Sequence, residues 1–199
     1  MTTRVVVTDA CVLINLIHVG RLPILDDLPG YEFVIPDHVY EEVADPSQRR
    51  ALDEALGHGK LKKEPLVDLG AIELYASLRA TLGSGEAACL AMAVTAGWMI
   101  ASDERRLFRR QVVARLGQDR LMTTVRLYVL AIEAGLLSVE QADQDKDELE
   151  RRRFRTGVAS FRDLVKGRGW ARIERPDPDR AHLRKRPASA QGVVQAKRA

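Results

Sequence analysis

The sequence predicts an α/β fold with three layers, in which helices cover both faces of a short parallel sheet. Three observations lead to this prediction. The segment Arg4–Thr8 is a run of mostly β-branched residues, which is typical of a buried strand. Short strand-like runs then alternate with helical stretches along the chain, as they do in parallel sheets. Apolar residues make up 46% of the 199 residues, which is enough to form a core.

The first half of the chain is expected to alternate between strands and helices. After the first strand, an apolar-periodic stretch containing Val12, Leu13, Leu16 and Ile17 predicts a helix that ends near Gly20. Further elements are predicted as a strand at 32–35, a helix that Asp37 caps and that runs through Val43, a helix at 47–57, and a weak edge strand or loop at 60–66.

The second half continues the alternation. The predicted elements are a helix at 71–82, a break at Gly83-Ser84-Gly85, a helix at 86–96 that Ser84 caps, a strand at 98–101, a basic helix at 104–116, a strand at 121–123 and a helix at 125–134. A polar helix at 138–151 should begin with a capping box of Ser138 and Gln141. Residues 154–165 are expected to form a packed loop and helix.

The composition changes near the end of the chain. From about residue 167 it is rich in Arg, Pro, Ala and Gln, so we expect a domain at 1–166 and a basic, disordered tail at 167–199. Residues 168–199 hold nine Lys and Arg against three Asp and Glu, which leaves 22 basic and 25 acidic residues in the body. The net charge of +3 therefore comes from the tail. Such a tail can bind nucleic acid electrostatically, and a solvated end without a ligand is the alternative.

Several classes of protein are disfavoured by simple patterns. No apolar run reaches the roughly 18 residues that a membrane span needs, and the start of the chain lacks a signal-peptide pattern, so we expect a cytoplasmic protein without membrane contact. Cys11 and Cys89 lie in apolar segments and form no CxxC, which favours reduced, buried thiols. The four histidines form no zinc-binding pattern.

Four acidic residues in separate segments are the candidate functional residues: Asp9, Glu42, Glu86 and Asp103. Each lies at the edge of an apolar run, where a charge is costly unless it is solvated, paired or bound to metal. Asp9 and Asp103 follow predicted strands, and ligands of parallel sheets bind beyond the carboxyl ends of the strands. We therefore expect all four acids to face one edge. Clustered carboxylates suit a hard cation such as Mg²⁺, which indicates chemistry on phosphates.

Each acid also has an ordinary structural explanation. Asp9 can cap the following helix, and an Asp at this position also serves in phosphoacceptor domains, although a suitable later lysine is missing. Glu42 is preferred over Glu41 because it lies three residues after Val39, on much the same helical face. Glu86 begins an apolar helix, where a carboxylate interacts favourably with the helix dipole.

Asp103 is followed by several arginines. Its ordinary role would be to cap a helix stabilised by i,i+4 pairs. In the functional interpretation it is a metal ligand with Glu104 as an auxiliary acid, and Ser102 bonds a water molecule or a phosphate. Arginine suits phosphate because its planar fork donates two hydrogen bonds. The candidate phosphate-contacting residues are Arg105, Arg106, Arg109 and Arg110.

Four motifs occur in order over about residues 4–165: TDACVLINL, IPDHVYEEV, GSGEAACLAMA and ASDERRL. Together they resemble the PIN-domain nucleases, in particular the bacterial and archaeal branch that includes toxin-type ribonucleases. The later segment LMTTVRLYVLAIEAGLL is similar to the C-terminal strand and helix of one PIN-like subgroup. The resemblance implies a PIN-like fold and a Mg²⁺- or Mn²⁺-dependent ribonuclease whose catalytic, metal-binding acids are Asp9, Glu42, Glu86 and Asp103.

The resemblance also implies binding partners, and it shows one departure from the family pattern, at Cys11. RNA would be the substrate, and an antitoxin protein and a second copy in a homodimer are the expected protein partners. The arginines that follow Asp103 are then the candidate residues for contact with RNA. Cys11 stands where the family often has Ser, Thr or Asn, and its thiol would weaken the site if that group orients Asp9. The alternative is a PIN-like scaffold that binds RNA or a partner without cutting, which Cys11 and the basic tail favour.

Overall fold

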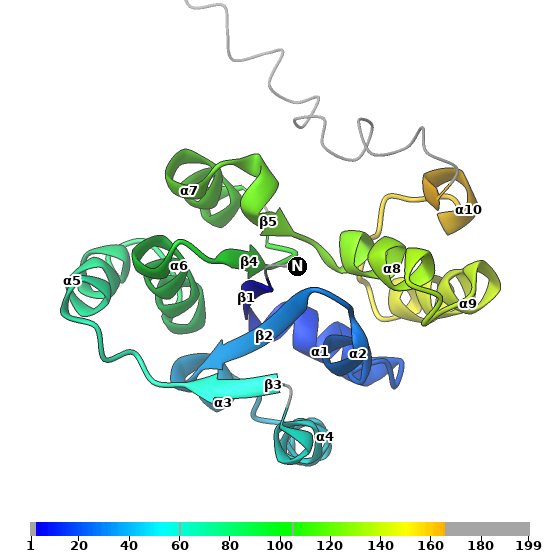
Figure 1. The fold of residues 1–199 in the computed structure, drawn as a ribbon, viewed down its shortest axis with the longest axis horizontal. Coiled ribbons are helices and arrows are strands. Elements are labelled where there is room, and N and C mark those ends of the chain that lie inside the picture. The colour runs from blue at the N-terminus through cyan, green and yellow to red at the C-terminus, as the bar shows by residue number, and fades with distance from the viewer. Residues whose placement is uncertain (1–2, 60, 105, 166–199) are drawn as a thin grey trace, which may run out of the picture.

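Five parallel strands form one sheet in the order β3-β2-β1-β4-β5 (Figure 1). The structure is a computed structural model and describes residues 3–165 except residues 60 and 105. The strands are β1 (Arg4–Thr8), β2 (Tyr31–Pro36), β3 (Leu61–Glu64), β4 (Met99–Ala101) and β5 (Leu121–Met122). The first strand has its predicted bounds and lies at the centre, paired with β2 and β4. Because helices lie on both faces of the sheet, its β-branched side chains Val6 and Val7 are fully buried (Figure 1).

Helices cover both faces of the sheet, which confirms the predicted three-layer α/β/α fold. They are α1 (Ala10–His18), α2 (Ile24–Asp27), α3 (Asp37–Glu42), α4 (Pro46–His58), α5 (Leu69–Leu78), α6 (Ser84–Ala96), α7 (Leu107–Leu116), α8 (Thr124–Glu133), α9 (Val139–Arg151) and α10 (Phe161–Asp163), with a 3-10 turn, η1, at Gln118–Arg120. Figure 1 shows α5 and α6 on one side of the sheet and α1, α8 and α9 on the other. In the described part of the chain, no helix is long and apolar enough to cross a membrane.

The parallel register brings the carboxyl ends of β1 and β4 together. Thr8 pairs with Ala101, and the backbone N–H of Asp9 donates to the carbonyl oxygen of Ala101 at 2.9 Å. One residue further, the N–H of Ser102 donates to the carbonyl of Met122 in β5 at 2.9 Å. The residues that follow these two strands therefore leave the sheet at the same edge.

Two predicted helix caps are wrong. Asp37 lies inside α3, where Pro36 holds the cap position, and its carboxylate pairs instead with Lys63 of β3 at 3.3 Å. Ser84 is the first residue of α6, and Gly83 precedes it at the cap position. In both places the backbone enters the helix one residue earlier than expected. The short helix α2 was not predicted, because four residues are too few to show a helical period.

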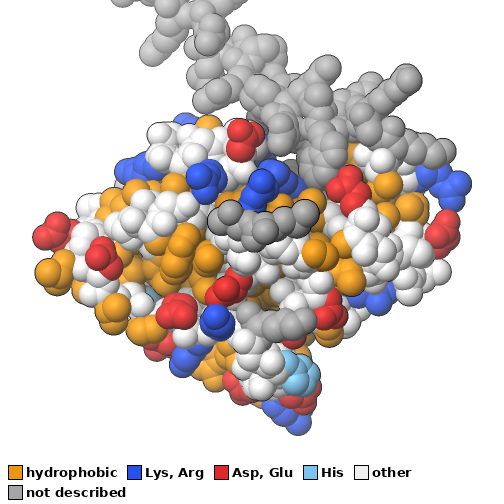
Figure 2. Space-filling view, in the orientation of Figure 1, with side chains coloured by type: hydrophobic (Ala, Val, Ile, Leu, Met, Phe, Trp, Pro, Cys, Tyr) orange, Lys and Arg blue, Asp and Glu red, His pale blue; other side chains and the backbone are white. Residues whose placement is uncertain are grey.

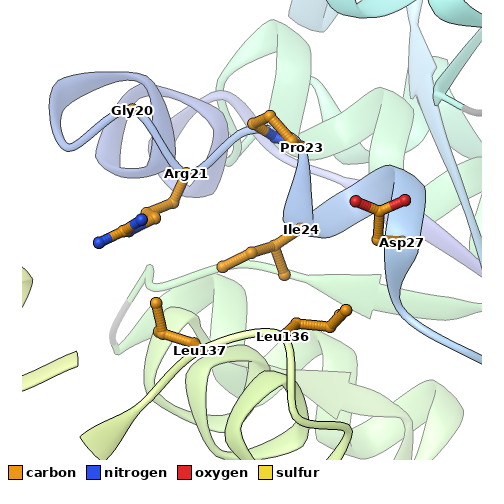
Figure 3. Close-up of a pocket in the computed structure, with 7 residues that line it drawn as sticks. All are labelled: Gly20, Arg21, Pro23, Ile24, Asp27, Leu136 and Leu137. Atoms are coloured by element: carbon orange, nitrogen blue, oxygen red, sulfur yellow. The ribbon is translucent and has the colours of Figure 1, made fainter. Parts of the chain in front are cut away.

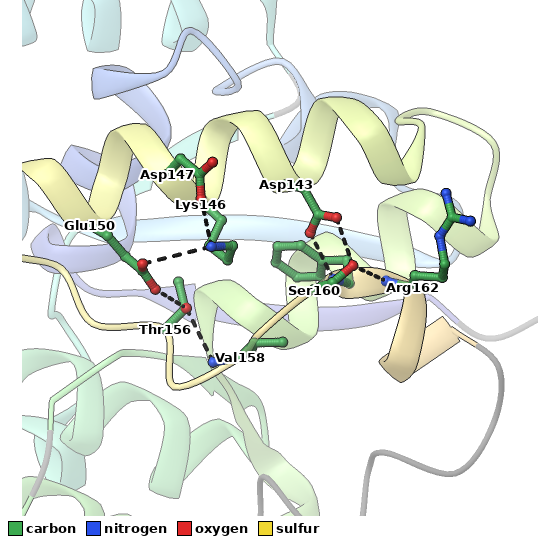
Figure 4. A network of polar contacts seen from close by, with 9 residues as sticks. Asp143, Lys146, Asp147, Glu150, Thr156, Val158, Ser160 and Arg162 are labelled. Atoms are coloured by element: carbon green, nitrogen blue, oxygen red, sulfur yellow. Dashed lines mark hydrogen bonds and ion pairs between the residues drawn. The ribbon is translucent and has the colours of Figure 1, made fainter.

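The end of the described chain packs against α8 and α9 as a loop and a short helix, as predicted (Figure 4). Asp143 of α9 accepts hydrogen bonds from the Ser160 hydroxyl at 2.7 Å and from the backbone N–H of Phe161 at 2.8 Å. The buried ring of Phe161 stacks on Tyr128 of α8, with ring centroids 5.3 Å apart. The predicted tail at 167–199 lies outside the described residues, so the domain boundary stays a prediction.

Candidate active site

Asp9 lies at the end of β1 and is also the N-cap of α1. Its side chain is buried, and its carboxylate accepts three hydrogen bonds from described residues. Oδ1 accepts from the backbone N–H of Ala10 at 2.9 Å, and Oδ2 accepts from the Cys11 thiol at 3.2 Å and from the Ser102 hydroxyl at 3.0 Å. A carboxylate has about four lone-pair sites. These donors therefore fix its orientation and leave about one site on Oδ1 for another ligand.

The environment of Asp9 disfavours its negative charge. Burial raises the pKa of Asp9 to about 6, although its three hydrogen bonds act in the opposite direction. The nearby charge of Glu42 adds to this rise in pKa. An anion that is buried next to another anion gains stability from a cation at the same place. The surroundings of Asp9 therefore favour either its protonated form or a nearby positive charge.

Asp103 is held by two helices that are remote in sequence. Its Oδ2 accepts from the Asn15 side-chain amide of α1 at 3.0 Å and from the Thr124 hydroxyl at 2.5 Å. Its Oδ1 accepts from the backbone N–H of Thr124, the first residue of α8, at 2.9 Å. Asp103 was predicted to begin its own helix, but α7 begins only at Leu107. The carboxylate places its charge at the start of α8 instead, where the helix dipole favours an anion.

Cys11 and Ser102 connect the two strand ends. The Cys11 sulfur accepts the backbone N–H of Asp103 at 3.3 Å, and the Ser102 oxygen accepts the N–H of Glu104 at 3.1 Å. Ser102 is buried and donates its hydroxyl to Asp9. Its contact with a water molecule or a phosphate stays a prediction. Burial, with the charges of Asp9 and Asp103, raises the pKa of the Cys11 thiol well above its ordinary range. Cys11 therefore stays protonated.

Glu42 reaches across to the start of α6. The backbone N–H of Gly85 donates to its Oε1 at 2.7 Å. A Cβ atom added to Gly85 would lie only 2.4 Å from Oε2, so this close approach requires a glycine. Both Glu42 and Glu41 are exposed, so Glu42 does not face inward as predicted. It is the one of the two that contacts the neighbouring helix.

Glu86 caps its own helix. Its Oε2 accepts the backbone N–H of Gly83 at 2.9 Å, which is the favourable helix-start role considered as the alternative. Three of the four acids nevertheless lie near one another. Burial raises the pKa of Cys89, and the charges of Asp9, Glu42 and Glu86 all add to that rise. The negative charges of these three carboxylates therefore all lie near the Cys89 thiol.

The acids fit a hard cation in chemistry but do not form a complete ligand set. Carboxylate oxygens are the donors that Mg²⁺ and Mn²⁺ prefer. Among the residues that the structure describes, however, no group of three or more His, Cys, Asp or Glu could hold one metal ion. Glu42 and Glu86 instead bond backbone N–H groups of α6 and its cap. The four predicted acids form a region of negative charge. Within it, hydrogen bonds from several donors orient the carboxylates of Asp9 and Asp103.

The predicted phosphate-contacting arginines lie at and before the start of α7. Arg106 and Arg110 are exposed and Arg109 is partly exposed, while Arg105 lies outside the described residues. Arg106 directly precedes the helix with a φ of +64°. Figure 2 shows basic side chains over the region of α7, in the upper part of the view. Their contact with RNA stays a prediction.

A cavity of about 190 Å³ lies elsewhere, between the connection from α1 to α2 and the turn from α8 to α9 (Figure 3). Its lining residues are Gly20, Arg21, Pro23, Ile24, Asp27, Leu136 and Leu137. None of the four acids lines it, so this cavity is separate from the acidic region.

Three residues that position the acids were not among the predicted site residues. Asn15 and Thr124 hold Asp103, and Gly85 makes room for Glu42. The sequence held one signal, because Asn15 is a polar residue within an apolar helix. In the structure its side chain is buried, with 8% exposure. Buried amides need a partner, but only the fold shows which one.

The comparison with protein families agrees with this geometry. A family model described as a PIN domain matches residues 5–167, which include all four acids and all of the sheet except Arg4. No curated protein matches the chain. PIN domains are in general nucleases. Because the match covers most of the chain and the sheet is all-parallel, the chain belongs to the PIN-domain family.

Proposed function

We propose that this protein is a ribonuclease that hydrolyses phosphodiester bonds in RNA with the help of Mg²⁺ or Mn²⁺. One observation carries the proposal: in a PIN domain, Asp9 and Asp103 leave neighbouring parallel strands at the same edge, joined through Cys11 and Ser102. Parallel sheets bind their ligands at this edge.

Asp9 and Asp103 would be the fixed ligands, and Glu42 and Glu86 would complete the set. A bound divalent ion supplies an activated water molecule and offsets the charge of the scissile phosphate. Asp9 needs little rearrangement, because three donors already orient its carboxylate. Glu42 and Glu86 would each exchange a backbone N–H for the ion. Glu104, which follows Asp103 directly, is the auxiliary acid.

The substrate would be held by the arginines near α7. Arg106, Arg109 and Arg110, together with Arg105, follow Asp103 in the chain and offer planar donors to RNA phosphates. The body of the chain has fewer basic than acidic residues, so attraction of RNA depends on this local group and on the basic tail. The tail would add an electrostatic contact that is independent of sequence.

The four motifs support a role as the toxin of a toxin–antitoxin pair in the cytoplasm, with an antitoxin protein and a second copy of the chain as partners. An antitoxin would block the acidic region with a basic side chain. Expression of the protein alone should arrest growth of a bacterial host, and Asp9→Asn should remove the arrest. Normal growth with abundant wild-type protein would contradict the toxin role.

The enzymatic proposal is tested by RNA cleavage. Purified full-length protein should cut a mixed RNA panel in the presence of Mn²⁺ or Mg²⁺, leave 5′-phosphate and 3′-hydroxyl ends, and stop when EDTA is added. Asp9→Asn and Asp103→Asn should lose at least about 100-fold in rate. Asp119→Asn is the matched control, because Asp119 is exposed and lies in η1. Cleavage that Asp9→Asn leaves unchanged would disprove the proposed site.

A second candidate is a PIN-like scaffold that binds RNA without cutting it. The observation in its favour is that Glu42 and Glu86 both cap α6 rather than face a shared ion. A scaffold would retain RNA in filter binding with EDTA present and release no cleavage products in Mn²⁺. Cleavage that depends on Asp9 excludes this alternative.

A further inference from the structure

Cys11 lies between the two acids that end neighbouring strands. Its sulfur is 3.2 Å from Oδ2 of Asp9 and 3.3 Å from the backbone nitrogen of Asp103, and it is 3.7 Å from the oxygen of Ser102. Asp9 follows β1, and Asp103 lies 92 residues after Cys11, beyond β4. One side chain in the first turn of α1 therefore touches both strand ends.

The hydrogen atoms at this junction can be assigned without conflict. Ser102 has one hydroxyl hydrogen, which it donates to Asp9, and its oxygen accepts the N–H of Glu104. The thiol of Cys11 has one hydrogen, which it also donates to Asp9, and its sulfur accepts the N–H of Asp103. Each side chain acts once as donor and once as acceptor. Cys11 thus performs the task that a hydroxyl would perform at this position.

The second cysteine shows that such contacts are not a general property of buried thiols in this protein. Cys89 is fully buried in α6, and its sulfur makes only a weak contact of 3.8 Å with the carbonyl oxygen of Thr8. It behaves as a small apolar side chain. The polar contacts of Cys11 are therefore specific to its position.

We propose that Cys11 is a positioning residue of the nuclease site: its thiol sets the relative placement of the Asp9 and Asp103 carboxylates by donating to one and accepting the backbone N–H of the other. The inference rests on the proposed function. It also reverses the expectation that a cysteine at this position weakens the site. Cys11 acts through the two acids and does not itself contact the ion or the RNA.

Two substitutions separate positioning from packing. Cys11→Ala removes a donor to Asp9 and leaves the N–H of Asp103 without its sulfur acceptor, whereas Cys11→Ser keeps both functions in a side chain of nearly the same shape. Cys89→Ala is the matched control, because it also removes a sulfur atom from the core but touches neither acid.

In the first test, each full-length variant is titrated with Mn²⁺ alone, and binding is measured as the rise in melting temperature. Loss of a group that orients ligands weakens metal binding by about 10- to 100-fold. Cys11→Ala should therefore bind Mn²⁺ at least about tenfold more weakly than wild type, and Cys11→Ser and Cys89→Ala should stay within about threefold. In RNA cleavage, Cys11→Ala should lower kcat and leave KM unchanged. Equal Mn²⁺ affinity of Cys11→Ala and wild type would overturn the inference.

The second test needs neither metal nor activity. In a double-mutant cycle of Cys11→Ala and Asp9→Asn, measured by urea unfolding in EDTA, the unfolding constant of the double variant should differ by about threefold or more from the product of the single effects. Additive effects would show that the thiol does not hold Asp9. If wild type neither binds Mn²⁺ nor cuts RNA, the proposed function fails, and this cycle still decides whether Cys11 positions Asp9. The inference would also be overturned if Cys11→Ser behaved like Cys11→Ala. A side chain that donates and accepts a hydrogen bond would then not be sufficient at this position.

Discussion

The side-chain amide of Asn15 donates to Oδ2 of Asp103 at 3.0 Å and so joins α1 to the end of β4, across 88 residues of sequence. The amide is nearly buried, and the acceptor carries a negative charge. Hydrogen bonds to charged groups contribute more to stability than neutral ones. This contact fixes the acid that follows β4, as Cys11 and Ser102 fix the acid that follows β1.

Asn15→Ala should reduce the free energy of unfolding by about 2 kcal/mol, because it removes a charged hydrogen bond and leaves Asp103 with fewer donors. It should also weaken Mn²⁺ binding about tenfold, since Asp103 loses one of its supports. Urea unfolding and Mn²⁺ titration measure the two effects. Equal affinity of Asn15→Ala and wild type for Mn²⁺ would show that Asp103 is not a ligand that Asn15 orients.

The raised pKa of Asp9 makes stability depend on pH. Because burial raises its pKa from 3.8 to about 6, the folded protein binds this proton more tightly than the unfolded chain. Between about pH 4 and 6 the folded state therefore holds more protons, and the contribution of Asp9 to stability falls as the pH rises through this window. At about 1.4 kcal/mol for each pKa unit, the fall is about 3 kcal/mol at most.

Asp9→Asn removes this dependence. The free energy of unfolding of Asp9→Asn minus that of wild type, measured in EDTA, should increase from pH 4 to pH 7 by up to about 3 kcal/mol. The other carboxylates cancel in this difference. A difference that stays constant over the range would mean that Asp9 titrates as an ordinary exposed acid.

Gly85→Ala should separate metal binding from stability. The new methyl group would meet Oε2 of Glu42, which is the end of a flexible and exposed side chain, so Glu42 can move away. The gain in helix propensity, about 0.5–1 kcal/mol, offsets the lost hydrogen bond, and stability should change by less than about 1 kcal/mol. Mn²⁺ affinity should fall about tenfold, because the methyl group keeps the Glu42 carboxylate out of the space beside Gly85 from which it would reach the ion.

Gly57→Ala is the control for Gly85→Ala. Gly57 lies in α4, and an added Cβ there meets no atom within 4 Å. This variant should keep the Mn²⁺ affinity of wild type and gain stability. If both glycine variants bind Mn²⁺ equally well, Glu42 takes no part in the ion site.

A partly buried ion pair that bonds to none of the four acids should matter for stability alone. Asp145 accepts from Arg21 Nε at 2.6 Å and from the Tyr128 hydroxyl at 3.1 Å, which ties α9 to α8 and to the loop after α1. Asp145→Asn should cost about 3 kcal/mol in urea unfolding, because it leaves a partly buried guanidinium without its charged partner. Its Mn²⁺ affinity, measured below the melting temperature, should equal that of wild type. A loss of affinity would show that the acidic region depends on this distant packing.

The sequence predicted what depends on local pattern. The strand at Arg4–Thr8 has its predicted bounds because its β-branched residues favour extended backbone and its last three residues are buried, and Asp9 follows it as expected. Helix starts were less predictable, because Asp37 and Ser84 each lie one residue inside the helix that they were expected to cap. A helix that begins one residue earlier changes the backbone conformation at that residue but hardly changes the pattern of apolar and polar residues.

The supporting contacts of the acids could not be predicted from local sequence. Asn15 and Asp103 are 88 residues apart, and the contact of Glu42 with Gly85 spans 43 residues. Both exist because the parallel sheet places α1, α3 and α6 around one edge. The sequence identified the acids, whereas the identity of the groups that orient them follows only from the fold.

If Asp9 and Asp103 together bind a divalent ion, Mn²⁺ should stabilise the full-length protein against thermal unfolding. An ion that binds one site stabilises the folded state by about 2.7 kcal/mol when its free concentration is 100 times the Kd. We predict a progressive rise in the Tm of wild type, reversed by EDTA and absent in Asp9→Asn/Asp103→Asn. A Tm of wild type that does not respond to Mn²⁺, or a double variant that responds as wild type does, would show that these two acids do not hold the ion.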